Sequence, residues 1–116
     1  MWIRSRRVGY TGNGYVDFTK PYSWIQFSVA SCTDGIYKAA VRYALGVSSD
    51  RPLDVIVNGD TQHSSTHFPP TGSWQDWEEV VVTVVLVDGH NSIRLQATGQ
   101  SGANIDAMTL MKYGAV

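Results

Sequence analysis

The stretch that decides the fold is Ile36-Tyr37-Lys38-Ala39-Ala40-Val41-Arg42-Tyr43-Ala44. Positions 37, 39, 41 and 43 carry apolar or aromatic side chains, and Lys38, Ala40 and Arg42 fill the other phase. A period of two places alternate side chains on opposite faces of a β-strand. The stretch therefore predicts a strand with one face in a core, and the polar segment from Gly46 to Pro52 predicts the connection that follows.

The same alternation recurs on both sides of this strand, and patterns of helical period are nearly absent. Tight turns are predicted at Asn58-Gly59-Asp60 and at Asp88-Gly89-His90-Asn91. The chain near Ser23 leaves Trp24 in the polar phase of its strand. Further strands are predicted over residues 23–29, 53–57, 93–97 and 104–111.

Two segments are harder to interpret from their pattern. Residues 61–73 are polar and contain Pro69-Pro70, so they predict a loop that cannot pair as a central strand. The segment from Trp74 to Leu86 carries valines in both phases, which predicts a long strand buried on both faces.

About eight short strands without a helix predict an all-β fold, a two-sheet antiparallel β-sandwich of jelly-roll type. An up-and-down barrel is the alternative. The chain has 116 residues and shows neither a linker nor an internal repeat, so we expect one domain over residues 1–116.

The charge balance bears on the class of partner. Nine basic side chains oppose 10 acidic ones, which disfavours nucleic acid as a partner. No apolar run is long enough to cross a bilayer, so no membrane partner is expected. The lone Cys32 excludes an internal disulfide, and the fold must rest on packing.

The segment Thr71-Gly72-Ser73-Trp74-Gln75-Asp76-Trp77 places two indoles three residues apart at the edge of a loop. A flat aromatic face suits a sugar ring, whose C–H groups pack on it while its hydroxyls remain free to hydrogen-bond. The segment therefore predicts a carbohydrate-binding site.

A set of motifs spread over residues 9–111 resembles the carbohydrate-binding modules of families 35 and 6. These are non-catalytic β-sandwiches that are usually attached to glycan-degrading enzymes. Each motif alone is weak, but all occur in the expected order. The motifs are Gly9 to Phe18, Gly35-Ile36-Tyr37, Val41 to Ala44, Val57-Asn58-Gly59, Thr71 to Trp77, Gly89 to Leu95 and Asn104-Ile105-Asp106.

The resemblance implies a ligand site among loops at one end of the sandwich. It assigns one aromatic to Tyr15, the second to the pair Trp74 and Trp77, and a hydroxyl-binding amide to Asn104. Strand parity places Trp74 in the phase of Val80 and Trp77 on the opposite face, so either indole is a candidate to stack on sugar. Each of these four side chains also has a purely structural interpretation, in the core or in a bend.

Family members also commonly hold a structural calcium ion, and the resemblance assigns Asp106 to it. This chain lacks the acidic pair of the first strand and has Arg4, Arg6 and Arg7 there instead. Calcium requires six to eight oxygen ligands. We therefore expect that no cofactor is required, with Asp106 either capping a loop or paired to one of those arginines, and keep a structural calcium as the alternative.

The short N-terminus has a further consequence, because a missing first strand leaves a sheet edge unpaired. Either residues 2–8 replace that strand or a second chain pairs there and forms a homodimer. The resemblance suggests a secreted protein, although no signal peptide is recognisable in this chain.

Catalysis is not expected. Glu78 and Glu79 are adjacent and point to opposite faces of a strand, so they cannot flank one glycosidic bond. His63 and His67 have the spacing of metal ligands only on a helix. The sequence thus predicts a non-enzymatic module that binds a polysaccharide or oligosaccharide. The alternative is a structural or self-associating sandwich that has lost its sugar site.

Overall fold

The computed structural model describes residues 2–4, 15–17, 23–99 and 102–114, with only the backbone of residues 2–4, 15–17 and 31–32. These residues form nine β-strands and include no helix that could span a membrane. The strands are β1 (Trp2–Arg4), β2 (Tyr15–Asp17), β3 (Trp24–Cys32), β4 (Gly35–Ala44), β5 (Leu53–Val57), β6 (Asp60–Thr66), β7 (Trp77–Leu86), β8 (Gly89–Ala97) and β9 (Asn104–Gly114).

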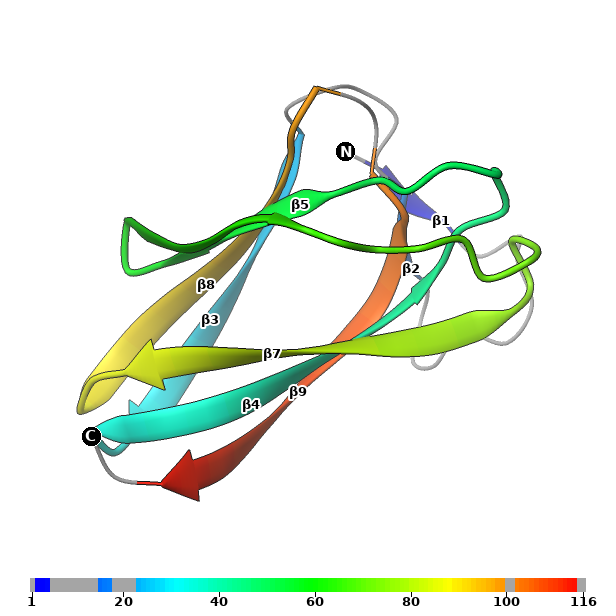
Figure 1. Ribbon diagram of the computed structural model, residues 1–116. Coiled ribbons are helices and arrows are strands. Elements are labelled where there is room, and N and C mark those ends of the chain that lie inside the picture. The colour runs from blue at the N-terminus through cyan, green and yellow to red at the C-terminus, as the bar shows by residue number, and fades with distance from the viewer. Residues whose placement is uncertain (1, 5–14, 18–22, 100–101, 115–116) are drawn as a thin grey trace.

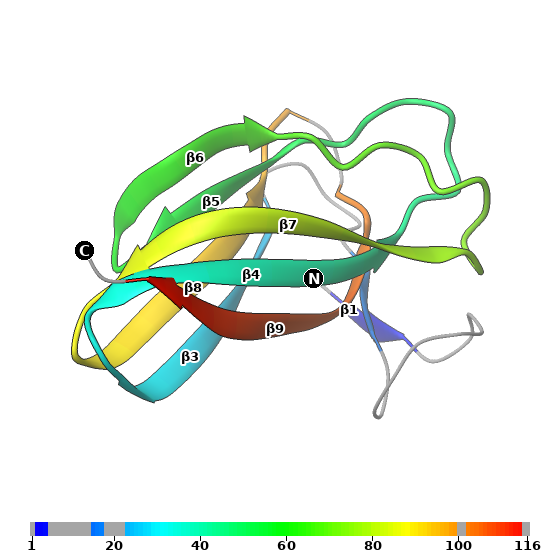
Figure 2. The same ribbon diagram turned by 60° about the horizontal axis from the view of Figure 1, so that its bottom comes forward.

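The strands form two antiparallel sheets that face each other (Figures 1 and 2). Sheet A has the order β1-β2-β9-β4-β7, and sheet B has the order β3-β8-β5-β6. The predicted all-β sandwich is confirmed, and two separate sheets replace the alternative of a barrel.

The core lies between the sheets, where the apolar phases of both sheets meet. In β4 the predicted phase is confirmed, since Tyr37, Ala39, Val41 and Tyr43 are all buried. The side chains of Leu53, Val55, Ile93 and Leu95 face them from sheet B and are fully buried. Burial of this apolar surface is the main stabilising term of a fold without disulfides.

The turn between β5 and β6 has the backbone that its sequence predicts. Asn58 and Gly59 both have positive φ, at 51° and 85°. Two positive values at the centre of a two-residue loop match the twist of the flanking strands and favour Asn-Gly.

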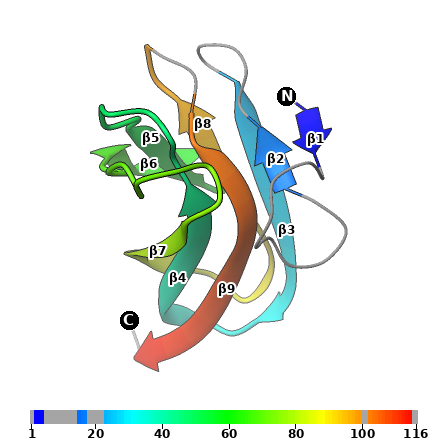
Figure 3. The ribbon, with the colours of Figure 1, turned by 90° about the vertical axis from the view of Figure 1, so that its right-hand side faces the viewer.

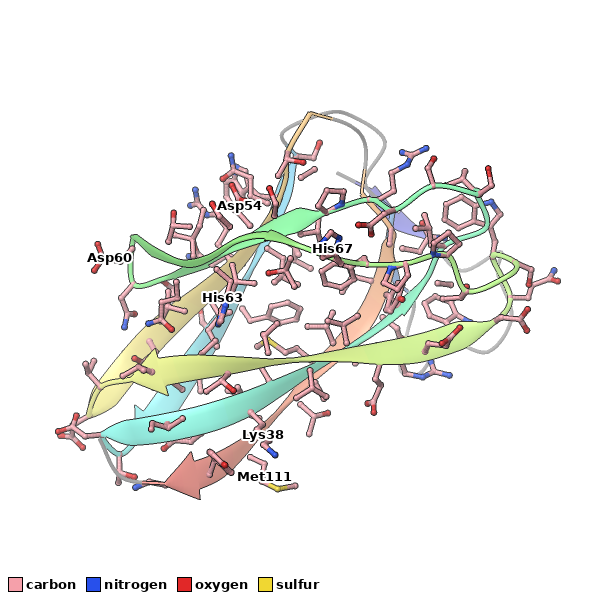
Figure 4. The ribbon with its side chains drawn as sticks, in the orientation of Figure 1. Lys38, Asp54, Asp60, His63, His67 and Met111 are labelled. Atoms are coloured by element: carbon pink, nitrogen blue, oxygen red, sulfur yellow. The ribbon has the colours of Figure 1, made fainter. Side chains whose placement is uncertain are left out.

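The prediction of a loop over residues 61–73 is wrong for its first half, which forms β6. The strand pairs with β5 alone, with two irregularities in register, and is the edge of sheet B. Its polar side chains bond across to the edge of sheet A, where the amide of Gln62 bonds both the N–H and the carbonyl of Val85. His63 points toward β7 and bonds the carbonyl of Thr83 (Figure 4). An edge strand needs one partner only, so a polar sequence can form it.

The prediction that the valine-rich strand is buried on both faces is also wrong. Val82, Val84 and Leu86 are buried, whereas Val81 and Val85 are 56% and 42% exposed. The outer face of sheet A is open along β7, β4 and β9, where Lys38 and Met111 point away from sheet B (Figure 4). Exposed valines in an edge strand favour extended backbone without contributing to the core.

At the N-terminal edge, the chain itself supplies a strand. β1 pairs antiparallel with β2, and β2 pairs with β9 (Figure 3). We expected either that residues 2–8 replace a missing first strand or that a second chain pairs there. Residues 2–4 form such a strand, whereas residues 5–8 lie outside the described residues. The homodimer stays a prediction.

Candidate functional site

One row of residues crosses four neighbouring strands at one end of sheet A. Trp77 pairs with Ala44, Ala44 with Asn104, and Asn104 with Asp17. Two strand spacings separate the backbone of Trp77 from that of Asn104, or about 10 Å. The register thus brings one predicted indole and the predicted amide to the same end of the same sheet.

Asn104 is 2% exposed, and its Oδ1 is a buried acceptor without a hydrogen-bond partner among the described residues. A buried carbonyl left without a donor costs about 1 to 3 kcal/mol. Such atoms are rare in folded proteins and mark places where a ligand or a bound water supplies the donor. Within the part of the chain that the structure describes, this oxygen is therefore an acceptor that still needs a donor.

Trp77 begins β7 and is half-buried. It shares the phase of Glu79 and Val81, which are exposed on the outer face of sheet A. The guanidinium carbon of Arg42 lies 5.2 Å from the centre of the Trp77 ring. This distance falls within the range of a cation–π interaction.

Trp74 lies in the turn before β7 and packs against the core from the side. Its indole lies close against Gly46, and a Cβ at that position would come within 2.3 Å of the ring. The two tryptophans thus differ in surroundings, and both are half-buried.

Hydrogen bonds tie the segment that carries Trp74 to the chain after β4. The Thr71 N–H bonds the carbonyl of Leu45 at 3.0 Å, and the Leu45 N–H bonds Oγ1 of Thr71 at 3.1 Å. The Tyr43 hydroxyl donates to the carbonyl of Pro69 at 2.7 Å. Phe68 is fully buried, and its N–H donates to Asp50. A loop bonded at several points holds its indole in one place.

Tyr43 is buried in the core and holds this loop from inside through its bond to Pro69. Desolvation, with the charges of Glu78 and Asp50, raises the pKa of its phenol to about 12. Its ring packs edge-on against Phe68, with 5.0 Å between ring centres. The residue is a structural support for the loop.

Asp106 forms an ion pair with Arg42. Its Oδ2 accepts a bond from Nη1 of Arg42 at 2.7 Å, and its side chain is fully buried. The expected pairing with Arg4, Arg6 or Arg7 stays a prediction, because the side chains of all three lie outside the described structure. The register of β9 shifts between Ile105 and Ala107, so Asp106 is an extra residue in a β-bulge opposite β4. Sequence parity cannot place a side chain in such a bulge.

The resemblance assigns Asp106 to a calcium ion, and the residues around Asp106 bear on that assignment. No cluster of three acidic, histidine or cysteine side chains occurs within the described ranges. Asp106 also faces a guanidinium, and a cation on a carboxylate disfavours a second cation there. The described residues therefore do not fit a calcium ion.

Tyr15 lies in β2, two residues before Asp17, which pairs with Asn104. Its backbone is thus next to the row of Trp77 and Asn104. The side chain of Tyr15 is not described, so its predicted contact with sugar stays a prediction.

The remaining candidates do not combine into a catalytic site. Glu78 pairs in register with the buried Tyr43, and Glu79 pairs with Arg42 on the other face. His67 bonds Asp50, whereas His63 bonds the β7 backbone. Each histidine therefore has a hydrogen-bond partner of its own, and the two glutamates belong to opposite phases of β7.

Sequence reasoning missed two features of the surface. The first is Arg42, whose alternation marks it only as a polar strand residue. The second is a hollow of about 230 Å³ on the outer face of sheet B, which is lined by Gln26, Ile56, Gly59, Thr61, Ser92 and Arg94. The exposed Trp24 lies against Arg94 beside it, and its place in the polar phase was the available signal.

Comparison with known proteins gives a consistent result. Residues 4–112 match the model of the carbohydrate binding module of family 6. A family 35 carbohydrate binding module from Clostridium thermocellum superposes with a TM-score of 0.92 at 31% identity, over 97% of this chain and 88% of that one.

Two enzymes are also similar in sequence. An exo-beta-D-glucosaminidase from Amycolatopsis orientalis is 38% identical over 110 residues, which are 93% of this chain and 11% of that protein. A cycloisomaltooligosaccharide glucanotransferase from Niallia circulans is 38% identical over 111 residues, with the same two shares. The chain thus spans about a tenth of the length of these relatives. It belongs to the carbohydrate-binding modules of the family 6 and family 35 type.

Proposed function

We propose that this module binds a polysaccharide or oligosaccharide, without catalysis, at the end of sheet A that carries Asn104 and Trp77, with Trp74 and Tyr15 as further candidate contacts. The observation that carries the proposal is the buried Oδ1 of Asn104, which has no hydrogen-bond partner among the described residues and lies two strands from Trp77 in one register row. A sugar hydroxyl is a donor that fits this acceptor.

The aromatic side chains supply the second component of binding. An indole face desolvates on contact with a sugar ring, and a loop held by hydrogen bonds loses little entropy when it binds. Trp77 has the phase of the exposed residues on the outer face of sheet A. Trp74 lies on the loop that hydrogen bonds from Thr71 tie to Leu45. A shallow site of this kind gives modest affinity, with dissociation constants of about 1 μM to 1 mM.

The proposal extends to the parent protein. Because the similar enzymes are about nine times longer than the matched segment, we propose that the module serves a larger glycan-processing enzyme as an accessory domain. Its role is to keep that enzyme on its polymer.

The test is affinity electrophoresis and tryptophan fluorescence against xylan, mannan, pectin, uronic acid oligosaccharides, chitosan oligomers and isomaltooligosaccharides. We expect retardation by at least one polymer, and loss of it in Trp77→Ala or Trp74→Ala. Trp24→Ala is the matched control, because this indole is exposed on sheet B. Loss of binding in that control instead would move the site to the hollow of sheet B.

The alternative of a structural, self-associating sandwich is not favoured, because the family to which the chain belongs is defined by carbohydrate binding. It predicts no response to any glycan of the panel together with a concentration-dependent increase in mass.

A further inference from the structure

Arg42 connects Asp106 to Trp77 on the outer face of sheet A. Its Nη1 lies 2.7 Å from Oδ2 of Asp106, and its guanidinium carbon lies 5.2 Å from the centre of the Trp77 ring. One side chain therefore contacts both the residue that the resemblance assigns to calcium and a candidate sugar-stacking indole.

The ion pair between Arg42 and Asp106 is largely buried, so it affects the stability of the fold. The Asp106 side chain is 0% exposed, and that of Arg42 is 29% exposed. A carboxylate removed from water requires a compensating charge, and a charge-assisted bond at this distance supplies it. Removal of the Arg42 guanidinium would take a directly bonded cation away from this buried carboxylate, which is costly.

The outer end of Arg42 is what reaches the indole. Because one nitrogen of the planar guanidinium is fixed on Asp106, the plane of the group has little freedom. A fixed cation near the indole restricts the orientations that this ring adopts. The bulge at Asp106 is thus coupled mechanically to the position of Trp77.

We propose that Arg42 takes the structural place of a divalent cation at Asp106 and, through this ion pair, positions the Trp77 indole for sugar. It is a positioning residue and not itself a sugar ligand. The second half of this inference rests on the proposed function, whereas the first half does not.

The first experiment uses the unmodified protein. Thermal unfolding is recorded in calcium chloride, in a chelator and in neither. We expect the same midpoint in all three, since the charge of Asp106 is already compensated. A midpoint that rises by several degrees in calcium and falls in the chelator would overturn the inference, because a ligand that binds only the folded state stabilises it.

The second experiment replaces Arg42→Met and measures affinity for the best glycan of the panel. We expect affinity to fall about three- to tenfold, which is the range of one lost cation–π contact. Arg94→Met is the matched control, because Arg94 lies 4.0 Å from the ring of Trp24 on sheet B. Affinity should change less than about twofold there, within the noise of such surface changes.

A spectroscopic readout separates positioning from stability. Acrylamide quenching of Trp77, taken as the difference between proteins with and without Trp77→Phe, should increase in Arg42→Met. Arg42→Lys should restore most of the thermal midpoint and little of the quenching protection, because an ammonium lacks the planar fork. Unchanged quenching and unchanged affinity in a folded Arg42→Met protein would refute the positioning role.

If Arg42→Met alone unfolds the protein, the double variant Arg42→Met with Asp106→Asn keeps the test decisive. Adding Asp106→Asn removes the buried charge, so the double variant should recover stability but not Trp77 protection. A double variant no more stable than the single one would count against the ion pair. If the unmodified protein binds no glycan, the proposed function fails, while the calcium and quenching experiments still decide this inference.

Discussion

The hydroxyl of Tyr43 shows how single residues hold the site in place. It lies at the end of the core, donates to the carbonyl of Pro69 and packs against Phe68. Below it the core is apolar, and above it runs the loop that leads to Trp74. The stability of this corner therefore depends on one phenol that keeps its proton.

Tyr43 predicts a loss of stability at high pH. Its folded pKa of about 12 lies above the ordinary value of 10.0, so the folded state retains a proton that the unfolded state releases. Stability is fully present below pH 10 and falls as pH rises toward 12, by about 2 to 3 kcal/mol in total. Urea unfolding at pH 9, 10 and 11 measures the fall. In Tyr43→Phe this component should vanish, and an equally steep fall there would contradict the assignment.

Gly46 predicts a packing defect next to Trp74. A Cβ at this position would meet three indole atoms at 2.3 to 2.6 Å, so Gly46→Ala must displace the ring. We expect a loss of about 1 to 3 kcal/mol from overpacking, with a shift of tryptophan emission. Gly114→Ala is the control, because nothing lies within 4 Å of its added Cβ. Equal stability of both variants would show that Trp74 moves freely.

At the scale of single residues, the sequence supplied candidate side chains for the site but could not predict what those side chains contact. It singled out Asn104 and Trp77, and the register of sheet A then placed them in one row. It could not predict the contact of Asp106 with Arg42, because the bulge between Ile105 and Ala107 breaks the alternation on which parity depends. A contact that joins residues 64 positions apart requires the three-dimensional register.

At the scale of elements, β7 and β6 show what alternation can and cannot predict. The buried phase of β4 and the turn at Asn58 and Gly59 were predicted correctly, because a local period and local turn chemistry determine them. β6 was missed, because its polar residues bond to a neighbouring sheet edge through Gln62. The exposed valines of β7 led to the wrong prediction that this strand is buried on both faces, because apolar character in a strand reflects propensity as well as burial.

The corrected faces of β7 predict opposite outcomes for two neighbouring valines. Val84 is fully buried, and Val85 is 42% exposed. Val84→Thr should cost about 1 to 3 kcal/mol, because it buries a hydroxyl in the core. Val85→Thr should change stability by less than about 0.5 kcal/mol, as for exposed sites in general. Chemical unfolding of the pair tests this, and a comparable loss at Val85 would indicate that another chain covers the outer face.

At the scale of the whole molecule, two sheets leave three surfaces with distinct characters. The end of sheet A carries the proposed sugar site, its outer face carries exposed Val81, Val85 and Met111, and sheet B carries the hollow beside Trp24. Because β1 supplies a strand at the N-terminal edge of sheet A, the described chain does not need a second copy to pair with β2. The sandwich itself was predictable from its alternating strands, whereas the choice of glycan was not, because hydroxyl recognition depends on loop geometry.

The most direct test is isothermal titration of the unmodified module and of Asn104→Ala with the glycan that retards it most. We predict a saturable isotherm for the unmodified module. Asn104→Ala should bind at least about tenfold more weakly, as expected from one lost polar contact in a desolvated site, while its thermal midpoint stays close to the original. Equal affinity in the two proteins, or no heat with any glycan of the panel, would contradict a sugar site at this end of sheet A.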